Sequence, residues 1–193
     1  MKNFITGLLF LLIGLTVACN QTKPAQQAKE ETMKETAAVQ EQPAPATDSK
    51  PSPARKAQGA IGAATVTINY GSPSVRGRKI WGALVPYGEI WRTGANEATT
   101  FEVSKDVMIE GKKLAAGKYG LFTIPTEGKW TIIFNTVPDQ WGAYNYDASK
   151  DALRVEVNPQ MLTEPVEAME FAVEPGQVVL RWEKLAVPFK VGG

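Results

Sequence analysis

Apolar and polar residues alternate over most of the chain after Gly59. In the segment 64–70, Val66, Ile68 and Tyr70 share one face, as expected for a strand with one buried side. Similar runs occupy 99–103, 107–109, 112–114, 118–124, 130–135, 153–157, 169–173, and 178–182 followed by 185–191. Turn-forming dipeptides such as Glu110-Gly111 separate them. We therefore expect an all-β fold, a single antiparallel β-sandwich of about 8–9 strands, jelly-roll-like or immunoglobulin-like.

The pattern divides the chain into three parts. Residues 1–18 hold a short charged start and an apolar run from Phe4 to Ala18, which is typical of a signal peptide and short for a membrane-spanning helix of about 20 residues. Residues 19–58 are rich in Ala, Gln, Glu, Lys and Pro without any aromatic residue, so we expect a flexible tether there. Residues 59–193 form the predicted sandwich domain.

The single cysteine, Cys19, stands where the apolar run ends. The segment Leu15-Thr16-Val17-Ala18-Cys19 resembles a bacterial lipobox, in which the cysteine is acylated and becomes the mature N-terminus. We therefore expect a lipoprotein of the cell envelope, attached to the membrane by its N-terminal lipid. Asn20 after the cysteine favours the outer membrane, by resemblance to enterobacterial sorting. The alternative is an ordinary signal peptide with a thiol nearby.

The amino-acid composition excludes several kinds of catalytic and metal-binding site. The chain has no histidine, which removes the usual Ser-His-Asp and Cys-His nucleophiles and all histidine-bound metals. A formal net charge of +1 gives no support for nucleic-acid binding. No cysteine follows Cys19, so the domain is held by its core rather than by disulfides. We expect no cofactor and no metal, and any enzyme activity would have to use carboxylates, Lys, Tyr, Ser or Thr.

Two long segments interrupt the strand pattern, at 71–98 and 136–152. Loops of this length in a small domain are often functional. Both are rich in aromatic and polar residues.

The first segment also carries a family signature. The run SPSVRGRKIWGALVPYGEIWRTGANEATT closely resembles that of bacterial domain of unknown function 2911. GKKLAAGKYGLFTIP, WTIIFN and WGAYNY continue the resemblance in the same order, over about residues 64–190. The resemblance implies an exported protein, often a lipoprotein, with a β-rich domain. It implies no established activity.

The candidate ligand-binding residues lie in the two long segments. Arg92 could hold a carboxylate or phosphate in a bidentate manner, Asn96 and Glu97 could bond hydroxyl groups, and Trp91 or Trp141 could offer an apolar platform. The full predicted set is Arg78, Trp91, Arg92, Asn96, Glu97, Trp141, Tyr144 and Tyr146. The competing interpretation is structural: the tryptophans pack in the core, and Arg92 pairs with Glu89 or Glu97 to brace the loop.

Three functions are compatible with this pattern. The leading hypothesis is non-catalytic binding of a polar ligand, such as a glycan or another envelope component. The first alternative is a glycan hydrolase with Glu97 and either Glu89 or Asp139 as its carboxylate pair. The second is a structural protein that binds an envelope protein partner. Asp139, Asp147 and Asp151 are a weak calcium candidate, because their spacing lacks the ligand alternation of an EF-hand.

Overall fold

The computed structural model describes residues 52–193. The predicted signal peptide 1–18, Cys19 and most of the predicted tether lie outside the described residues. No helix within 52–193 is long and apolar enough to span a membrane.

The described part is built from strands, with a single 3-10 turn, η1, at Ala148–Lys150. The strands are β1 (Ala54–Ile61), β2 (Ala64–Gly71), β3 (Thr99–Val103), β4 (Val107–Ile109), β5 (Lys112–Leu114), β6 (Gly117–Ile124), β7 (Trp130–Asn135), β8 (Asp151–Val157), β9 (Gln160–Glu174) and β10 (Gln177–Gly192).

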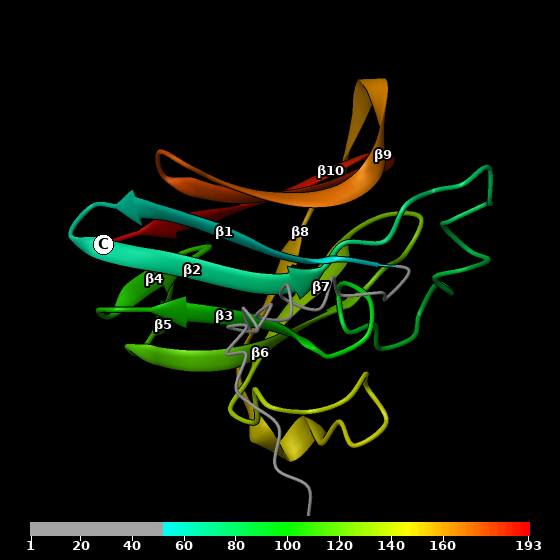
Figure 1. Cartoon of the computed structure of the whole chain (residues 1–193). Coiled ribbons are helices and arrows are strands. Elements are labelled where there is room, and N and C mark those ends of the chain that lie inside the picture. The colour runs from blue at the N-terminus through cyan, green and yellow to red at the C-terminus, as the bar shows by residue number, and fades with distance from the viewer. Residues whose placement is uncertain (1–51) are drawn as a thin grey trace, which may run out of the picture. The chain divides into compact units, whose positions relative to one another are not determined.

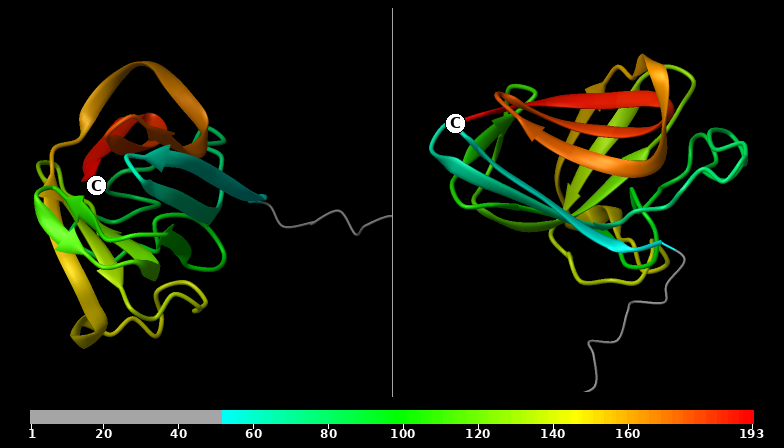
Figure 2. Two further views of the ribbon diagram at one scale, coloured as in Figure 1. Left: turned by 90° about the vertical axis from the view of Figure 1, so that its left-hand side faces the viewer. Right: turned by 45° about the horizontal axis from the view of Figure 1, so that its top comes forward.

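The strands form two antiparallel sheets, so the expected all-β sandwich is confirmed (Figure 1). One sheet has the order β1-β2-β3-β6-β7-β8 and the other β5-β4-β10-β9. Most connections are hairpins. After β3 the chain leaves the first sheet, forms β4 and β5 in the second sheet, and returns to the first sheet at β6. Figure 2 shows the long β9–β10 hairpin lying across the six-stranded sheet.

The alternating pattern explains the core. Val66, Ile68 and Phe101 on the inner face of the first sheet are fully buried. They pack in one cluster with inner residues of β10, including Phe189 and Val191. Burial of each large apolar side chain contributes about 1.5–3 kcal/mol, so this cluster holds the sheets together.

The turn between β4 and β5 follows from its sequence. Glu110 and Gly111 both have positive φ, 47° and 80°, as a two-residue hairpin turn of type I′ requires. The predicted bounds of both flanking strands agree with the structure.

Three features differ from the sequence expectation. Strand β9 begins at Gln160, well before the expected run at 169–173. The first described strand, β1, begins at Ala54, five residues before the expected start at Gly59. The runs 178–182 and 185–191 form one strand, β10, interrupted by a bulge at Glu183, whose φ is +53°. The structure describes ten strands within residues 52–193.

Gly59 allows β1 to approach the second sheet. A Cβ atom there would lie 2.8 Å from Val173 Cγ1 of β9, a distance that real Cβ atoms do not show. A glycine is therefore needed where β1 passes β9.

Candidate functional site

The long segment between β2 and β3 is tied to both sheets, although Figure 1 shows it extending away from them on one side. At its start, the Ser72 hydroxyl donates to the carbonyl of Met169 in β9, at 2.6 Å. Near its end, Trp91 and Thr123 of β6 exchange two backbone hydrogen bonds of 2.8 and 2.9 Å. These anchors give the segment a fixed position from which side chains can form a site.

The sequence Trp-Arg-Thr-Gly-Ala-Asn-Glu at 91–97 forms a tight turn. Thr93 and Asn96 both have positive φ, 54° and 65°. Asn adopts this conformation readily, whereas a β-branched residue such as Thr does so only under strain. Thr93 is held there by two hydrogen bonds at its hydroxyl and by the Thr99 hydroxyl, which donates to its carbonyl at 2.8 Å.

A close backbone contact fixes this turn against the end of β2. The Ala95 N–H donates to the Gly71 carbonyl at 3.2 Å. A Cβ atom at Gly71 would lie only 2.2 Å from the Ala95 carbonyl oxygen. The backbones can approach this closely only because residue 71 is a glycine.

A cavity of about 280 Å³ lies beside this turn, and we call it the Arg92 cavity. Its walls include Arg78, Trp91, Arg92, Asn96 and Trp182. Four of the eight predicted ligand-binding residues thus share one cavity. Trp182 comes from β10, and the sequence alone gave no reason to include it.

The Arg92 cavity is lined by two arginines and, among the residues that the structure describes, by no Asp or Glu. The Arg92 Nε is buried and has no hydrogen-bond partner. None of the ion pairs found within 52–193 involves Arg92. Arg78 is held by the carbonyls of Val75 and Ser74 rather than by a carboxylate.

This arrangement bears on the two interpretations of Arg92, as a ligand-binding residue or as a brace of the loop. A loop brace would be paired, because a buried N–H left without an acceptor costs about 1–3 kcal/mol. The expected brace partners, Glu89 and Glu97, do not line the Arg92 cavity.

Four tryptophans pack at the base of the site. Trp81 and Trp91 from the long segment meet Trp130 of β7 and Trp182 of β10, with ring centroids 4.8–6.5 Å apart. Trp91 is only 9% exposed, so most of its ring packs in the core.

The indole N–H groups of these four tryptophans differ in whether they have a hydrogen-bond acceptor. Those of Trp91 and Trp130 donate to the carbonyls of Gly94 and Thr126. Those of Trp81 and Trp182 are buried without an acceptor. Trp182, which lines the Arg92 cavity, thus carries an unpaired buried donor as Arg92 does.

Asn96 also borders a second cavity, a groove of about 450 Å³ that we call the sheet groove. Its walls include Arg55, Lys56, Asn69, Glu97 and Lys118. Predicted residue Glu97 is thus placed at the sheet groove and not in the Arg92 cavity.

The two long segments meet at Glu97. Glu97 and Trp141 form an isolated antiparallel bridge, flanked by hydrogen bonds from the Ala98 N–H to Gln140 and from the Gly142 N–H to Asn96. Trp141 is 55% exposed, and side chains of opposite residues in such a bridge lie on the same face. Trp141 therefore lies next to the sheet groove.

Tyr144 and Tyr146 do not join the other predicted residues in a cavity. Tyr144 is 84% exposed and lines neither the Arg92 cavity nor the sheet groove. Tyr146 packs on Phe122, with ring centroids 5.1 Å apart.

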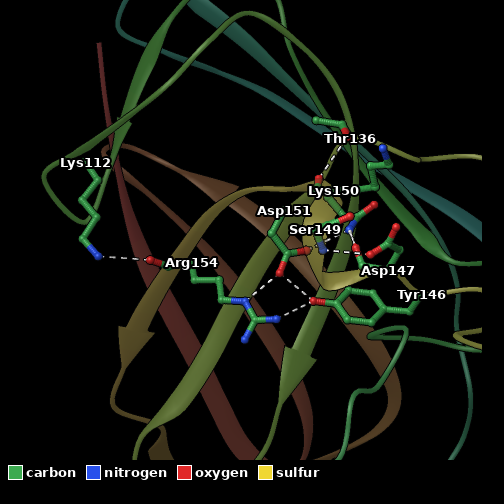
Figure 3. A network of polar contacts seen from close by, with 9 residues as sticks. Lys112, Thr136, Tyr146, Asp147, Ser149, Lys150, Asp151 and Arg154 are labelled. Atoms are coloured by element: carbon green, nitrogen blue, oxygen red, sulfur yellow. Dashed lines mark hydrogen bonds and ion pairs between the residues drawn. The ribbon is translucent and has the colours of Figure 1, made fainter.

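Figure 3 shows the Tyr146 hydroxyl and the Arg154 guanidinium meeting at Asp151. The hydroxyl donates to Asp151 Oδ2 at 2.7 Å, and Arg154 donates to both groups. Burial and the hydrogen bond to Asp151 raise the pKa of Tyr146 to about 12. Tyr146 thus anchors the second long segment to β8.

The predicted carboxylate pairs do not share any of the cavities described above. Glu97 lines the sheet groove, Glu89 is exposed, and Asp139 pairs with Lys118 at 2.9 Å on the surface. Of the calcium candidates, Asp151 is occupied by Arg154 and Tyr146. Within the described residues no group of three or more acidic or other metal-ligating side chains could hold a metal ion.

A third cavity, of about 370 Å³, has a different character. Trp81, Tyr87 and Met161 form apolar walls, and its charged residues are Glu127, Glu183 and Lys184. It therefore carries acidic side chains, unlike the Arg92 cavity.

The fold and these cavities define the protein as a β-sandwich domain with an arginine-lined cavity between its long loop and its core. A family model described as a protein of unknown function, DUF2911, matches residues 52–191. The protein belongs to the DUF2911 family, as its motifs indicated. No curated protein and no solved structure matches the chain. Function therefore has to be argued from the site.

Proposed function

We propose that the domain is a non-catalytic binding module for a polar ligand that carries a carboxylate or phosphate group, held in the Arg92 cavity. The observation that supports this most strongly is the Arg92 guanidinium, which lies beside Arg78 without any carboxylate partner in the described chain. An anion would supply the missing acceptors in the bidentate geometry that arginine favours.

The surroundings of Arg92 suit a small ligand. Trp91 and Trp182 provide apolar walls, while Asn96 adds an amide. Apolar walls with a few convergent polar groups are the usual form of a small-ligand site.

The hydrolase alternative has less support. A glycosidase needs two carboxylates about 5–10 Å apart on either side of the bond that is cleaved. Neither of the carboxylate pairs expected from the sequence lies together in a described cavity.

Ligand-induced stabilisation tests the proposed function. The chain from Asn20 onward, without the predicted signal peptide and cysteine, is suitable because the described core lies entirely within 61–191. Thermal unfolding is measured with inorganic phosphate, acetate, sugar acids and neutral sugars at constant ionic strength. A ligand at 100 times its dissociation constant should stabilise the protein by about 2.7 kcal/mol.

The control is Arg92→Met, which removes the guanidinium and keeps an apolar side chain. We expect anions, and not neutral sugars, to raise the melting temperature of the unmodified chain and to leave that of the variant unchanged. An equal rise in both proteins would show that the anions act elsewhere, and the proposal would fail.

We also propose that the protein is a lipoprotein of the cell envelope, anchored through Cys19. This proposal is supported by the apolar run and by the lipobox-like segment that ends at this cysteine. Expression with an alkyne-labelled fatty acid should label the protein in membranes, and Cys19→Ser should abolish the label. Labelling that persists in the variant would contradict the proposal.

A further inference from the structure

We infer that the sheet groove is a second subsite that extends the Arg92 cavity, and that together they bind an acidic oligosaccharide. This inference rests on the proposed function, because it takes the anion site at Arg92 as one end of the ligand site. It adds a second set of contacts and the class of ligand.

The two cavities lie next to each other. Asn96 lines both of them, and the Asn96 side-chain amide donates to the Ser52 carbonyl at 3.0 Å. Ser52 lines the Arg92 cavity and Ala54 lines the sheet groove, so the start of the described chain passes between them. A ligand that occupies both has to pass Asn96.

The sheet groove carries an excess of positive charge. Arg55 and Lys56 are exposed on β1, and neither has a carboxylate partner among residues 52–193. Lys118 is paired with Asp139, and Glu97 is the acidic residue of the walls. With Arg78 and Arg92, four cations without a carboxylate partner line two neighbouring cavities of a chain whose net charge is only +1.

Neutral hydrogen-bonding groups point to a sugar rather than to a bare polyanion. Lys56, Asn69 and Thr100 are neighbours across β1, β2 and β3 on the outer face of the sheet. The Asn69 amide donates to the Thr100 hydroxyl at 3.3 Å, which leaves the Asn69 carbonyl and the Thr100 hydroxyl hydrogen for a ligand.

An aromatic side chain lies beside Glu97 at the edge of the groove. Trp141 lies on the same face as its bridge partner Glu97 and is more than half exposed. A broad ring at the edge of a polar groove offers an apolar platform to the face of a sugar. Cations, amides, a hydroxyl and an exposed indole are together the contacts that an acidic sugar chain requires.

The two subsites predict a multivalent effect. Linking two binding events in one molecule raises affinity by roughly 10²–10⁴ over either event alone. An acidic oligosaccharide should therefore bind much more tightly than its monomer, provided that it reaches both cavities.

The experiment compares three probes by isothermal titration calorimetry: galacturonic acid, hexagalacturonate and the methyl ester of the same hexasaccharide. The proteins are the chain from Asn20 onward, Arg55→Ser/Lys56→Ser, Arg92→Met and a charge-matched control, Lys105→Ser/Lys150→Ser. The two control lysines are exposed and line none of the cavities described above. Circular dichroism verifies that each variant is folded.

We expect hexagalacturonate to bind at least roughly 100-fold more tightly than the monomer. Arg55→Ser/Lys56→Ser should remove this gain, whereas Arg92→Met should weaken both ligands. The methyl ester should bind weakly, and the control variant should behave as the unmodified chain.

Two other results separate the two proposals. If the gain for the hexasaccharide survives Arg55→Ser/Lys56→Ser while Arg92→Met weakens both ligands, the sheet groove is not a subsite and the proposed function stands. If Arg92→Met leaves monomer affinity unchanged, the proposed function itself fails. Equal binding of the acid and its methyl ester would overturn the assignment of an acidic ligand.

Discussion

Replacing Arg92 by methionine should make the domain more stable, which is the opposite of what a structural arginine would do. The Nε is buried without an acceptor, and no carboxylate within 52–193 pairs with the guanidinium. Leaving a buried donor unpaired costs about 1–3 kcal/mol, and methionine removes the donor while keeping an apolar side chain in the cavity wall.

The expected gain is at the lower end of that range. Arg92 is partly exposed as a whole residue, so water solvates part of its charge. Loss of packing around the guanidinium offsets some of the gain. We expect the free energy of unfolding to rise by about 1 kcal/mol, which corresponds to an increase of about 2–4 °C in melting temperature.

Urea and thermal unfolding, followed by circular dichroism in a buffer without phosphate or carboxylate, measure this difference. The matched control is Arg154→Met, because Arg154 does have partners: it donates to Asp151 at 2.6 Å and to the Tyr146 hydroxyl at 2.7 Å. This control should lower stability. Destabilisation by Arg92→Met as large as that by Arg154→Met would refute our account, since Arg92 would then brace the loop.

Three further substitutions test the packing that positions the site. Gly71→Ala places a methyl group 2.2 Å from the Ala95 carbonyl oxygen, so unfolding in urea should show a loss of about 1–3 kcal/mol; a neutral effect would mean that the contact is looser than described. Asp151→Asn removes a carboxylate that accepts hydrogen bonds from Asn135, Tyr146 and Arg154, and should cost about 2–4 kcal/mol by the same measurement; a loss under 1 kcal/mol would contradict it. The folded-state pKa of Tyr146, about 12, lies above the unfolded value of 10, so the contribution of the Tyr146 hydroxyl to stability is complete below pH 10 and is lost as the pH rises through 12. Tyr146→Phe should therefore lose less stability than the unmodified chain between pH 10 and pH 12, and parallel pH profiles would refute this assignment.

Local alternation was enough to place most strands, because each of them has one buried face. The strand at 99–103 agrees with the structure at both ends. Strand β1 was missed because its sequence, ARKAQGAI, is mostly exposed and lacks an alternating apolar face. It is held by hairpin pairing with β2 and by the close approach of Gly59 to Val173 of β9, and the second of these contacts is remote in sequence.

The long strand β10 was divided for a related reason. Glu183 and Lys184 interrupt the apolar alternation, and the structure accommodates them in a bulge with positive φ at Glu183. A bulge adds one residue to a strand, so the apolar side chains that follow it return to the buried face of the sheet. A strict period of two along the sequence does not predict this.

The candidate site was partly predictable. The unusual composition of the first long segment identified Arg78, Trp91, Arg92 and Asn96, which the structure brings to one cavity. Trp182, Arg55 and Lys56 belong to strands that reach the two cavities through tertiary contacts. The residues next to them in the sequence therefore do not indicate that they line a cavity. Tyr146 shows that an aromatic residue in a polar loop can anchor that loop, as its hydrogen bonds with Asp151 and Arg154 do here.

The central claim is that the Arg92 cavity binds an anion. Two-dimensional ¹H–¹⁵N NMR on labelled protein observes the two unpaired donors of its walls directly, through the arginine Nε–H and tryptophan indole N–H signals. Variants Arg92→Met and Trp182→Phe assign the two signals. On titration with galacturonic acid, we predict that the Arg92 Nε–H and the Trp182 indole N–H shift together and saturate with one dissociation constant, while the indole of Trp130, already bonded to Thr126, stays in place. Shifts confined to other residues, or none for Arg92 at saturating ligand, would contradict the claim.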